Sequence, residues 1–237
     1  MTERLAKSLR MAARSMHRHG LSHAYGHVSG RIDEGRFLVT PPLPLGLVTP
    51  HEPGLVVSSV GELPAGALPE VCLHQAIYTK RPEIGAICRV QPPSVIALSV
   101  LGRTPRALHG LGTYFAPQCP IWQGVSLVRD NGQANLVADM MGKHAAIVLS
   151  GNGCVVAAAT VEEAAVLAYF LEDAARIELA VLPAEAAGQR VREYLPDEVS
   201  ARAIRTGGLF ERMWQYLTFN DEEAELDSGS VDALSGM

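Results

Sequence analysis

The sequence predicts a layered α/β (α+β) domain in which short strands and helices share one core. Short apolar runs typical of strands alternate with segments of helical spacing along most of the 237 residues. No shift in composition marks a domain boundary, and 48% hydrophobic with 19% charged residues is usual for a globular chain. We expect one domain over residues 1–219 and a disordered acidic tail over 220–237, rich in Ser and Gly.

The N-terminal part predicts a helix followed by strands. Apolar residues recur at helical spacing from Leu5 to Met16, and Gly20 stands where the helix should end. "GHVSGRID" and "RFLVT" read as short strands joined by a polar turn. Five prolines predict a loop over residues 41–54, and "GLVVSSVGEL" predicts a further strand and turn.

The middle of the chain predicts two helices around a strand. Pro69 suits the first position of a helix that Pro82 ends. "IGAICRV" predicts a strand that Pro92 and Pro93 break, and "SVIALSVLG" predicts a short helix with Ser94 as its N-cap. "AAIVLSGNGCVVAAA" predicts two apolar strands hinged at "GNG".

The C-terminal part predicts a long helix and a shorter one. Thr160 and Glu163 form a capping-box pattern that opens an amphipathic helix to about Leu182. "LFERMWQYL" has apolar residues at helical spacing and is expected to dock on a neighbouring subunit.

Charge and cysteine content limit the partners and the compartment. The net charge is -5 and no basic cluster occurs, which argues against nucleic acid or an anionic membrane as a partner. Four widely spaced cysteines predict reduced core thiols. The N-terminus lacks the apolar stretch of a signal peptide, and no apolar run is long enough to span a bilayer. We expect a cytoplasmic protein.

Three segments in order resemble the class II aldolase/adducin family. They are "GHVSGR", "LPEVCLHQAIYTKRPEIGAICRVQPPSVIAL" and "AAIVLSGNGCVVAAATVEEAAVLAYFLEDAA", and the resemblance spans roughly Leu5 to Leu182. It implies a central, mostly antiparallel sheet flanked by helices, and a symmetric homotetramer with active sites near subunit interfaces. The family includes aldolases, epimerases, decarboxylases and the metal-free adducin, so membership does not fix the chemistry.

The resemblance also implies a metal site, with a glutamate at the start of a helix as acid and base. Catalytic members hold zinc or manganese through HxH on a strand and a histidine from the GxG hinge. The matching positions here are Arg89, Gln91 and Asn152, while Glu70 is kept. A cation beside a dication is unfavourable, and amides are poor zinc ligands. We therefore expect no metal cofactor, since Glu70 and His74 alone are too few ligands.

The replacements suggest a different chemistry. Strand alternation places Arg89 and Gln91 on one face. Beside Asn152 they would supply one fixed positive charge and two amides, which suits an oxyanion or a substrate carboxylate. The alternative is that Arg89 pairs with Glu70 in an inert polar core.

The expected phosphate site of sugar-phosphate members is also altered. In place of the family's asparagine and of its hydroxyl-bearing pairs stand His27, Pro42, Leu43, Leu68 and Pro69. The loss of these donors argues for a substrate without phosphate.

Further candidate residues follow from the same resemblance. "GHVSGR" is similar to the decarboxylase branch, which makes His27, Ser29 and Arg31 candidate substrate contacts; otherwise they are ordinary strand residues. His74 is a fourth candidate contact. Tyr114 lies in "GTYFAPQCPIW", which resembles a stretch that reaches the neighbouring site, so it is a candidate proton donor or an interface aromatic.

Two functions remain. The first is a lyase acting on a small non-phosphorylated carboxylate or hydroxy-carbonyl compound without a metal, by decarboxylation, retro-aldol cleavage or enolate isomerisation. Glu70 would move the proton, and the side chains at 89, 91 and 152 would hold the enolate or carboxylate. The second is an adducin-like pseudoenzyme with an assembly or ligand-binding role. The interpretation favours the enzyme, because a retired site would be free to accept apolar residues.

Overall fold

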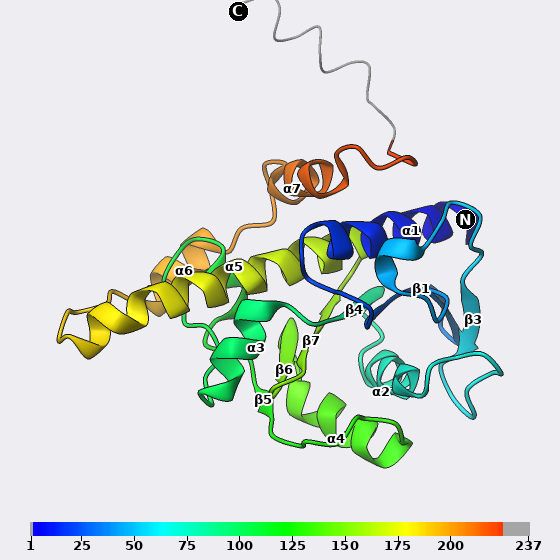
Figure 1. Ribbon diagram of the computed structural model, residues 1–237, viewed down its shortest axis with the longest axis horizontal. Coiled ribbons are helices and arrows are strands. Elements are labelled where there is room, and N and C mark those ends of the chain that lie inside the picture. The colour runs from blue at the N-terminus through cyan, green and yellow to red at the C-terminus, as the bar shows by residue number, and fades with distance from the viewer. Residues whose placement is uncertain (1, 225–237) are drawn as a thin grey trace, which may run out of the picture.

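The protein forms one seven-stranded sheet covered by helices on both faces (Figure 1). The computed structural model describes residues 2–224. The strands lie in the order β3-β2-β1-β4-β7-β6-β5, and every neighbouring pair is antiparallel except β5 with β6. Their bounds are β1 His27–Asp33, β2 Arg36–Val39, β3 Leu55–Ser58, β4 Ala86–Val90, β5 Ile121–Trp122, β6 Ala146–Leu149 and β7 Gly153–Ala158. The predicted α/β class and the mostly antiparallel sheet are confirmed.

The helices divide between the two faces of the sheet. Their bounds are α1 Thr2–Arg18, α2 Cys72–Lys80, α3 Pro93–Val100, α4 Asn131–Met141, α5 Val161–Ala186, α6 Pro196–Arg202 and α7 Leu209–Thr218. Short 3-10 turns occupy Leu45–Leu47, Pro69–Val71 and Gly112–Phe115. Helices α1 and α5 pack on one face in one hydrophobic cluster, and α2 and α4 pack on the other face in a second cluster.

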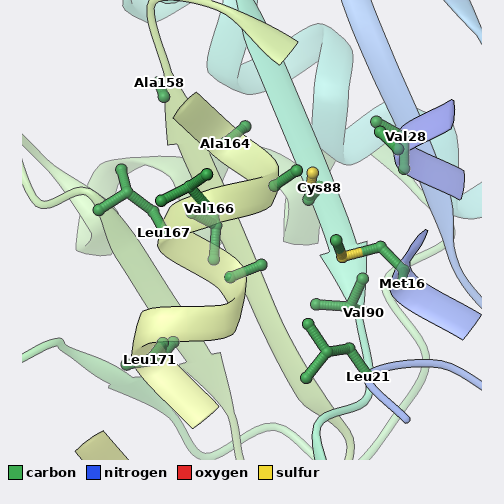
Figure 2. Packing of buried hydrophobic residues seen from close by; sticks show 14 of the residues in the cluster. Met16, Leu21, Val28, Cys88, Val90, Ala158, Ala164, Val166, Leu167 and Leu171 are labelled. Carbon is green, nitrogen blue, oxygen red and sulfur yellow. The ribbon is translucent and has the colours of Figure 1, made fainter. Parts of the chain in front are cut away.

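Strand β4 shows how alternation separates these clusters. Cys88 and Val90 join the cluster under α1 and α5, where Met16 and Val166 lie nearby (Figure 2). Ile87 joins the cluster under α2. Because successive side chains of a strand point to opposite faces, Arg89 lies on the face opposite Cys88 and Val90, as predicted, and the structure shows that this is the α2 side.

Two helix boundaries differ from the predictions. The segment at Pro69 begins as a 3-10 turn, and α2 starts only at Cys72. Helix α5 runs through Pro183 to Ala186 instead of ending at Leu182.

Ser94 is not the N-cap of α3, so that prediction was wrong. The backbone N–H of Ser94 donates to the carboxylate of Glu172 at 2.9 and 3.1 Å, and that of Val95 donates at 3.1 Å. A buried carboxylate from α5 therefore caps this helix, and it satisfies donors that local residues leave open.

The segment after α7 packs against α1 through ion pairs. Arg14 donates to Asp221 at 2.6 Å and to Glu223 at 2.8 Å, Arg10 contacts Glu223 at 2.7 Å, and Arg18 contacts Asp221 at 2.8 Å. We call these five residues the arginine clamp. Within the predicted tail, residues 221–223 thus contact α1; residues 225–237 lie outside the described residues.

The cysteine prediction agrees with the structure, because all four cysteines are buried and unpaired. Within residues 2–224, no helix is both long and apolar enough to cross a membrane.

Candidate active site

Four buried side chains form one hydrogen-bonded chain between β1 and α2, which we call the polar chain. The hydroxyls of Tyr78 and Ser29 lie 2.9 Å apart, Ser29 Oγ lies 2.6 Å from Nδ1 of His74, and Nε2 of His74 lies 2.7 Å from Nδ1 of His27. His27 and Ser29 are two residues apart on the strand, and His74 and Tyr78 are one turn apart on the helix, so each pair shares a face. All four are at most 2% exposed.

Burial keeps the polar chain uncharged. It lowers the pKa of His74 to about 3, and the nearby charge of Arg89 acts in the same direction. Burial, then His74 and Arg89, lower the pKa of His27 well below its usual value. Burial also raises the pKa of Tyr78 far above its usual value, so the phenol keeps its proton. Both imidazoles are therefore neutral at neutral pH.

Arg89 faces His27 across the β1–β4 register, and its side chain is 3% exposed. Its Nη1 donates to the backbone carbonyls of Val90 at 3.0 Å and Asn152 at 3.1 Å. Its Nη2 lies 3.6 Å from Oε1 of Glu70, an ion pair longer than a hydrogen bond. Its Nε has no acceptor within the part of the chain that the structure describes. One edge of this buried cation is thus free of close hydrogen bonds.

The hinge before β7 places Asn152 beside the end of β4. Nε2 of Gln91 donates to Oδ1 of Asn152 at 3.1 Å. Gly153 has a φ of +106°, and a Cβ there would lie 2.2 Å from the carbonyl oxygen of Val90. Only glycine allows this approach of the two backbones, so the predicted hinge brings the two amides together.

Most of the predicted site residues therefore meet at one place. The carboxylate of Glu70 and the side chains of Arg89, Gln91 and Asn152 form what we call the Arg89 group. The polar chain lies next to it and contains the other predicted contacts on β1 and α2 except Arg31.

Arg31 hydrogen-bonds to backbone carbonyls rather than to the Arg89 group. Its guanidinium donates to the carbonyls of Ile84 at 2.7 Å, Tyr78 at 2.9 Å and Arg81 at 3.2 Å. It also lines a cavity of about 320 Å³ between α1, β1 and the start of α5. The structure thus does not bring Arg31 to the place where His27 meets Arg89.

Tyr114 lies on the other face of the sheet. Its hydroxyl donates to the carbonyl of Ile204, and its ring packs against Phe170 of α5 and Phe210 of α7. Within one subunit it is separated from the Arg89 group by the sheet itself. Any role of Tyr114 in catalysis therefore requires a neighbouring copy of the chain.

Tyr78 is the member of the polar chain that the sequence analysis missed. Its position one turn after His74 was the available signal, because residues four apart on a helix share a face. A phenol within an apolar helical run is most often a core residue, so only the contact with Ser29 reveals its partner.

The Arg89 group does not suit the divalent metal that the family resemblance implies. The guanidinium of Arg89 is a buried permanent cation, and the two amides bond to each other. Amide and guanidinium groups are not ligands that zinc prefers. Within residues 2–224, no group of three or more His, Cys, Asp or Glu side chains is arranged to hold a metal ion.

Comparison with known proteins decides the family. The model described as "Class II Aldolase and Adducin N-terminal domain" matches residues 7–179. The chain belongs to this family. Among similar proteins, the 3,4-dihydroxyphthalate decarboxylase of Terrabacter sp. is 32% identical over 181 residues, which cover 70% of this chain and 76% of that protein. The decarboxylase of the same name from Arthrobacter keyseri is 29% identical over 235 residues, which cover 89% and 91%.

Solved structures share the fold at lower identity. An aldolase II superfamily protein from Pseudomonas syringae has a TM-score of 0.76 at 20% identity, covering 91% of this chain and 90% of that one. L-fuculose 1-phosphate aldolase from Glaciozyma antarctica has a TM-score of 0.74 at 21% identity, covering 91% and 88%. These confirm the class II aldolase fold.

Proposed function

We propose that this protein is a carbon–carbon lyase that decarboxylates a small, hydroxylated, non-phosphorylated carboxylate without a divalent metal. The observation that carries the proposal is the free edge of Arg89, a buried cation beside a partly exposed carboxylate. The names of the two decarboxylase relatives support an aromatic dicarboxylate with two hydroxyl groups as the substrate class.

The free edge of Arg89 suits a carboxylate. Nη1 is held by two backbone carbonyls, which fix the plane of the guanidinium. Nε and Nη2 lie along one edge of that plane and match the two oxygens of a carboxylate in a bidentate contact. The pair with Glu70 is loose at 3.6 Å, so a substrate carboxylate can take its place at Nη2.

Glu70 is the group that moves the proton. Its side chain is 22% exposed and lies against Arg89, within reach of a molecule bound there. As a carboxylate it accepts the proton of a substrate hydroxyl and returns that proton to the ring carbon that bears the carboxylate. The bond from this carbon to the carboxylate then breaks and carbon dioxide leaves. The bonding pair restores the aromatic ring, and the resulting phenolate takes a proton from water.

We further propose that the chain works as a homotetramer. This arrangement would allow Tyr114 of a neighbouring subunit to reach the Arg89 group, which it does not reach within its own subunit.

A second candidate is an adducin-like binding protein without catalysis. The ion pair between Arg89 and Glu70, and the hydrogen bond between Gln91 and Asn152, satisfy much of the Arg89 group without any substrate. Groups that already satisfy one another are typical of a structural polar core.

The test is carbon dioxide release from 3,4-dihydroxyphthalate by wild type, Glu70→Gln and the exposed control Glu62→Gln. We expect Glu70→Gln to lose about 10²- to 10⁴-fold in kcat with an equal or higher melting temperature. The control should match wild type. Activity should survive chelator treatment. No release by wild type, together with a lower melting temperature of Glu70→Gln, would favour the binding protein; loss on chelation with recovery on adding zinc or manganese would overturn the metal-free mechanism.

A further inference from the structure

The hydrogen bonds of the polar chain all run the same way from donor to acceptor, and Tyr78 at the inner end of the chain sets this direction. The Tyr78 hydroxyl is buried and keeps its proton, and its hydrogen-bond partner is Ser29 Oγ. A buried hydroxyl that does not donate leaves its proton unsatisfied, which is costly in the interior. The phenol therefore donates to Ser29, and Ser29 donates its own proton to Nδ1 of His74.

This direction of donation then determines which ring nitrogen of His74 and of His27 carries the proton. With Nδ1 of His74 accepting, its proton is on Nε2, which donates to Nδ1 of His27. The proton of His27 is therefore on its Nε2. The opposite direction would leave the phenol proton of Tyr78 without an acceptor between β1 and α2, whereas this direction leaves the open donor on Nε2 of His27, next to Arg89, where a bound anion can accept it.

Nε2 of His27 is buried and has no acceptor in the described part of the protein. The same is true of Nε of Arg89. His27 and Arg89 are direct partners in the antiparallel β1–β4 register, so their side chains are neighbours on one face of the sheet. Two buried donors without acceptors thus occur side by side, and together they suit an oxygen with negative charge.

We propose that the polar chain fixes His27 in its Nε2–H form, and that this N–H binds the substrate carboxylate together with the free edge of Arg89. The inference rests on the proposed function for the identity of the ligand. Tyr78, Ser29 and His74 are positioning residues, since they act only through His27. Because Nε2 of His27 already carries a proton, it cannot serve there as the base, which leaves Glu70 to move the proton.

The first experiment needs no ligand. Protein labelled with ¹⁵N at the histidine rings, in wild type and in Tyr78→Phe, reports by long-range ¹H–¹⁵N correlation which ring nitrogen carries the proton. We expect both His27 and His74 as Nε2–H forms in wild type. Tyr78→Phe should show a mixture, because the donor that sets the direction is gone. The exposed Tyr25→Phe should match wild type. An Nδ1–H form of His27 in wild type overturns the inference even if Tyr78→Phe fails to fold.

The second experiment tests the ligand with phthalate, which lacks the hydroxyls that the proposed chemistry needs. We expect titration with phthalate to shift the Nε2 proton of His27 in wild type, and this shift to be lost in Arg89→Met. No shift at His27 overturns the carboxylate site.

The same measurements separate this inference from the proposed function. A shifted His27 proton without carbon dioxide release from 3,4-dihydroxyphthalate would reject the lyase and keep the carboxylate site. Turnover of 3,4-dihydroxyphthalate with His27 in the Nδ1–H form would reject this inference and keep the lyase. In the active enzyme we expect Tyr78→Phe to raise KM several-fold more than it lowers kcat, because the change weakens binding of a carboxylate rather than proton transfer by Glu70.

Discussion

The polar chain and the arginine clamp satisfy polar groups in opposite ways. The chain lies between sheet and helix, and it consists of neutral groups joined by three hydrogen bonds. The clamp lies on α1 and consists of three arginines paired with Asp221 and Glu223. The polar chain keeps its groups neutral, whereas the arginine clamp keeps its groups charged and pairs each charge with an opposite one.

The difference follows from what each group contacts. His74 is fully buried beside the charge of Arg89, so its neutral form is favoured. Burial is the largest single influence on Asp221 and opposes its ionisation. The hydrogen bonds from Arg14 and from the backbone N–H of Glu223, with the charges of Arg14 and Arg18, together outweigh burial, so the pKa of Asp221 lies below its usual value. Burial favours the neutral form in both regions, and the neighbouring charges and hydrogen bonds decide whether that preference is reinforced, as at His74, or overcome, as at Asp221.

The largest expected effect comes from cutting the polar chain at its centre. His74→Leu keeps a similar volume but leaves His27 and Ser29 without their shared partner. We expect a loss of about 3 to 5 kcal/mol in the free energy of unfolding, because each unsatisfied buried group costs about 1 to 3 kcal/mol. Urea unfolding near neutral pH measures this change. A loss below about 1 kcal/mol would show that the chain is not formed.

The second effect is a fall in stability as the pH falls, and its main source is the two fully buried histidines, His27 and His74. Their folded pKa values lie below the unfolded value near 6.5, so unfolding takes up protons once the pH is below about 6.5. Their contribution is complete above that pH and is lost as the pH falls toward the folded value of His74, about 3. Two protons correspond to about 2.7 kcal/mol per pH unit.

Urea unfolding at a series of pH values between about 7 and 5 tests the slope. His74→Gln should reduce it, while His51→Gln, which changes an exposed side chain, should leave it unchanged. An unchanged slope in His74→Gln would contradict the assignment. The clamp should not contribute in this range, because its carboxylates lose their stabilisation only below an unfolded pKa of about 4.

The smallest effect is expected at the clamp. Arg14→Gln removes the arginine that contacts both Asp221 and Glu223. We expect a loss of about 1 to 2 kcal/mol, because the segment after α7 can move its carboxylates into water instead of leaving them buried.

Hydrogen exchange should locate this effect in α7 and the following residues. The control is Arg36→Gln, which breaks an exposed ion pair with Asp33. A loss as large as that of His74→Leu would show that the clamp belongs to the cooperative core.

The sequence predicted those parts of the site that depend on neighbours along the chain. Strand alternation placed Arg89 on the face opposite Cys88, and the glycines of the hinge predicted the turn that carries Asn152. The resemblance to the family then identified Glu70 as their neighbour. The resemblance did not predict that Arg89 and Glu70 would lie 3.6 Å apart, farther than a hydrogen bond.

By itself, the sequence determined the order of most strands and helices, the family and the types of residue at the site, but it gave no signal for β5, α4 or α6. Alternation, prolines and glycines act through local stereochemistry, so they can be read from adjacent residues. Only the tertiary structure decided that Tyr78 orders the polar chain, that Glu172 caps a helix 78 residues earlier, and that Arg14 pairs with Asp221. These contacts depend on how helices pack on the sheet, because packing alone brings residues distant in sequence within hydrogen-bond distance.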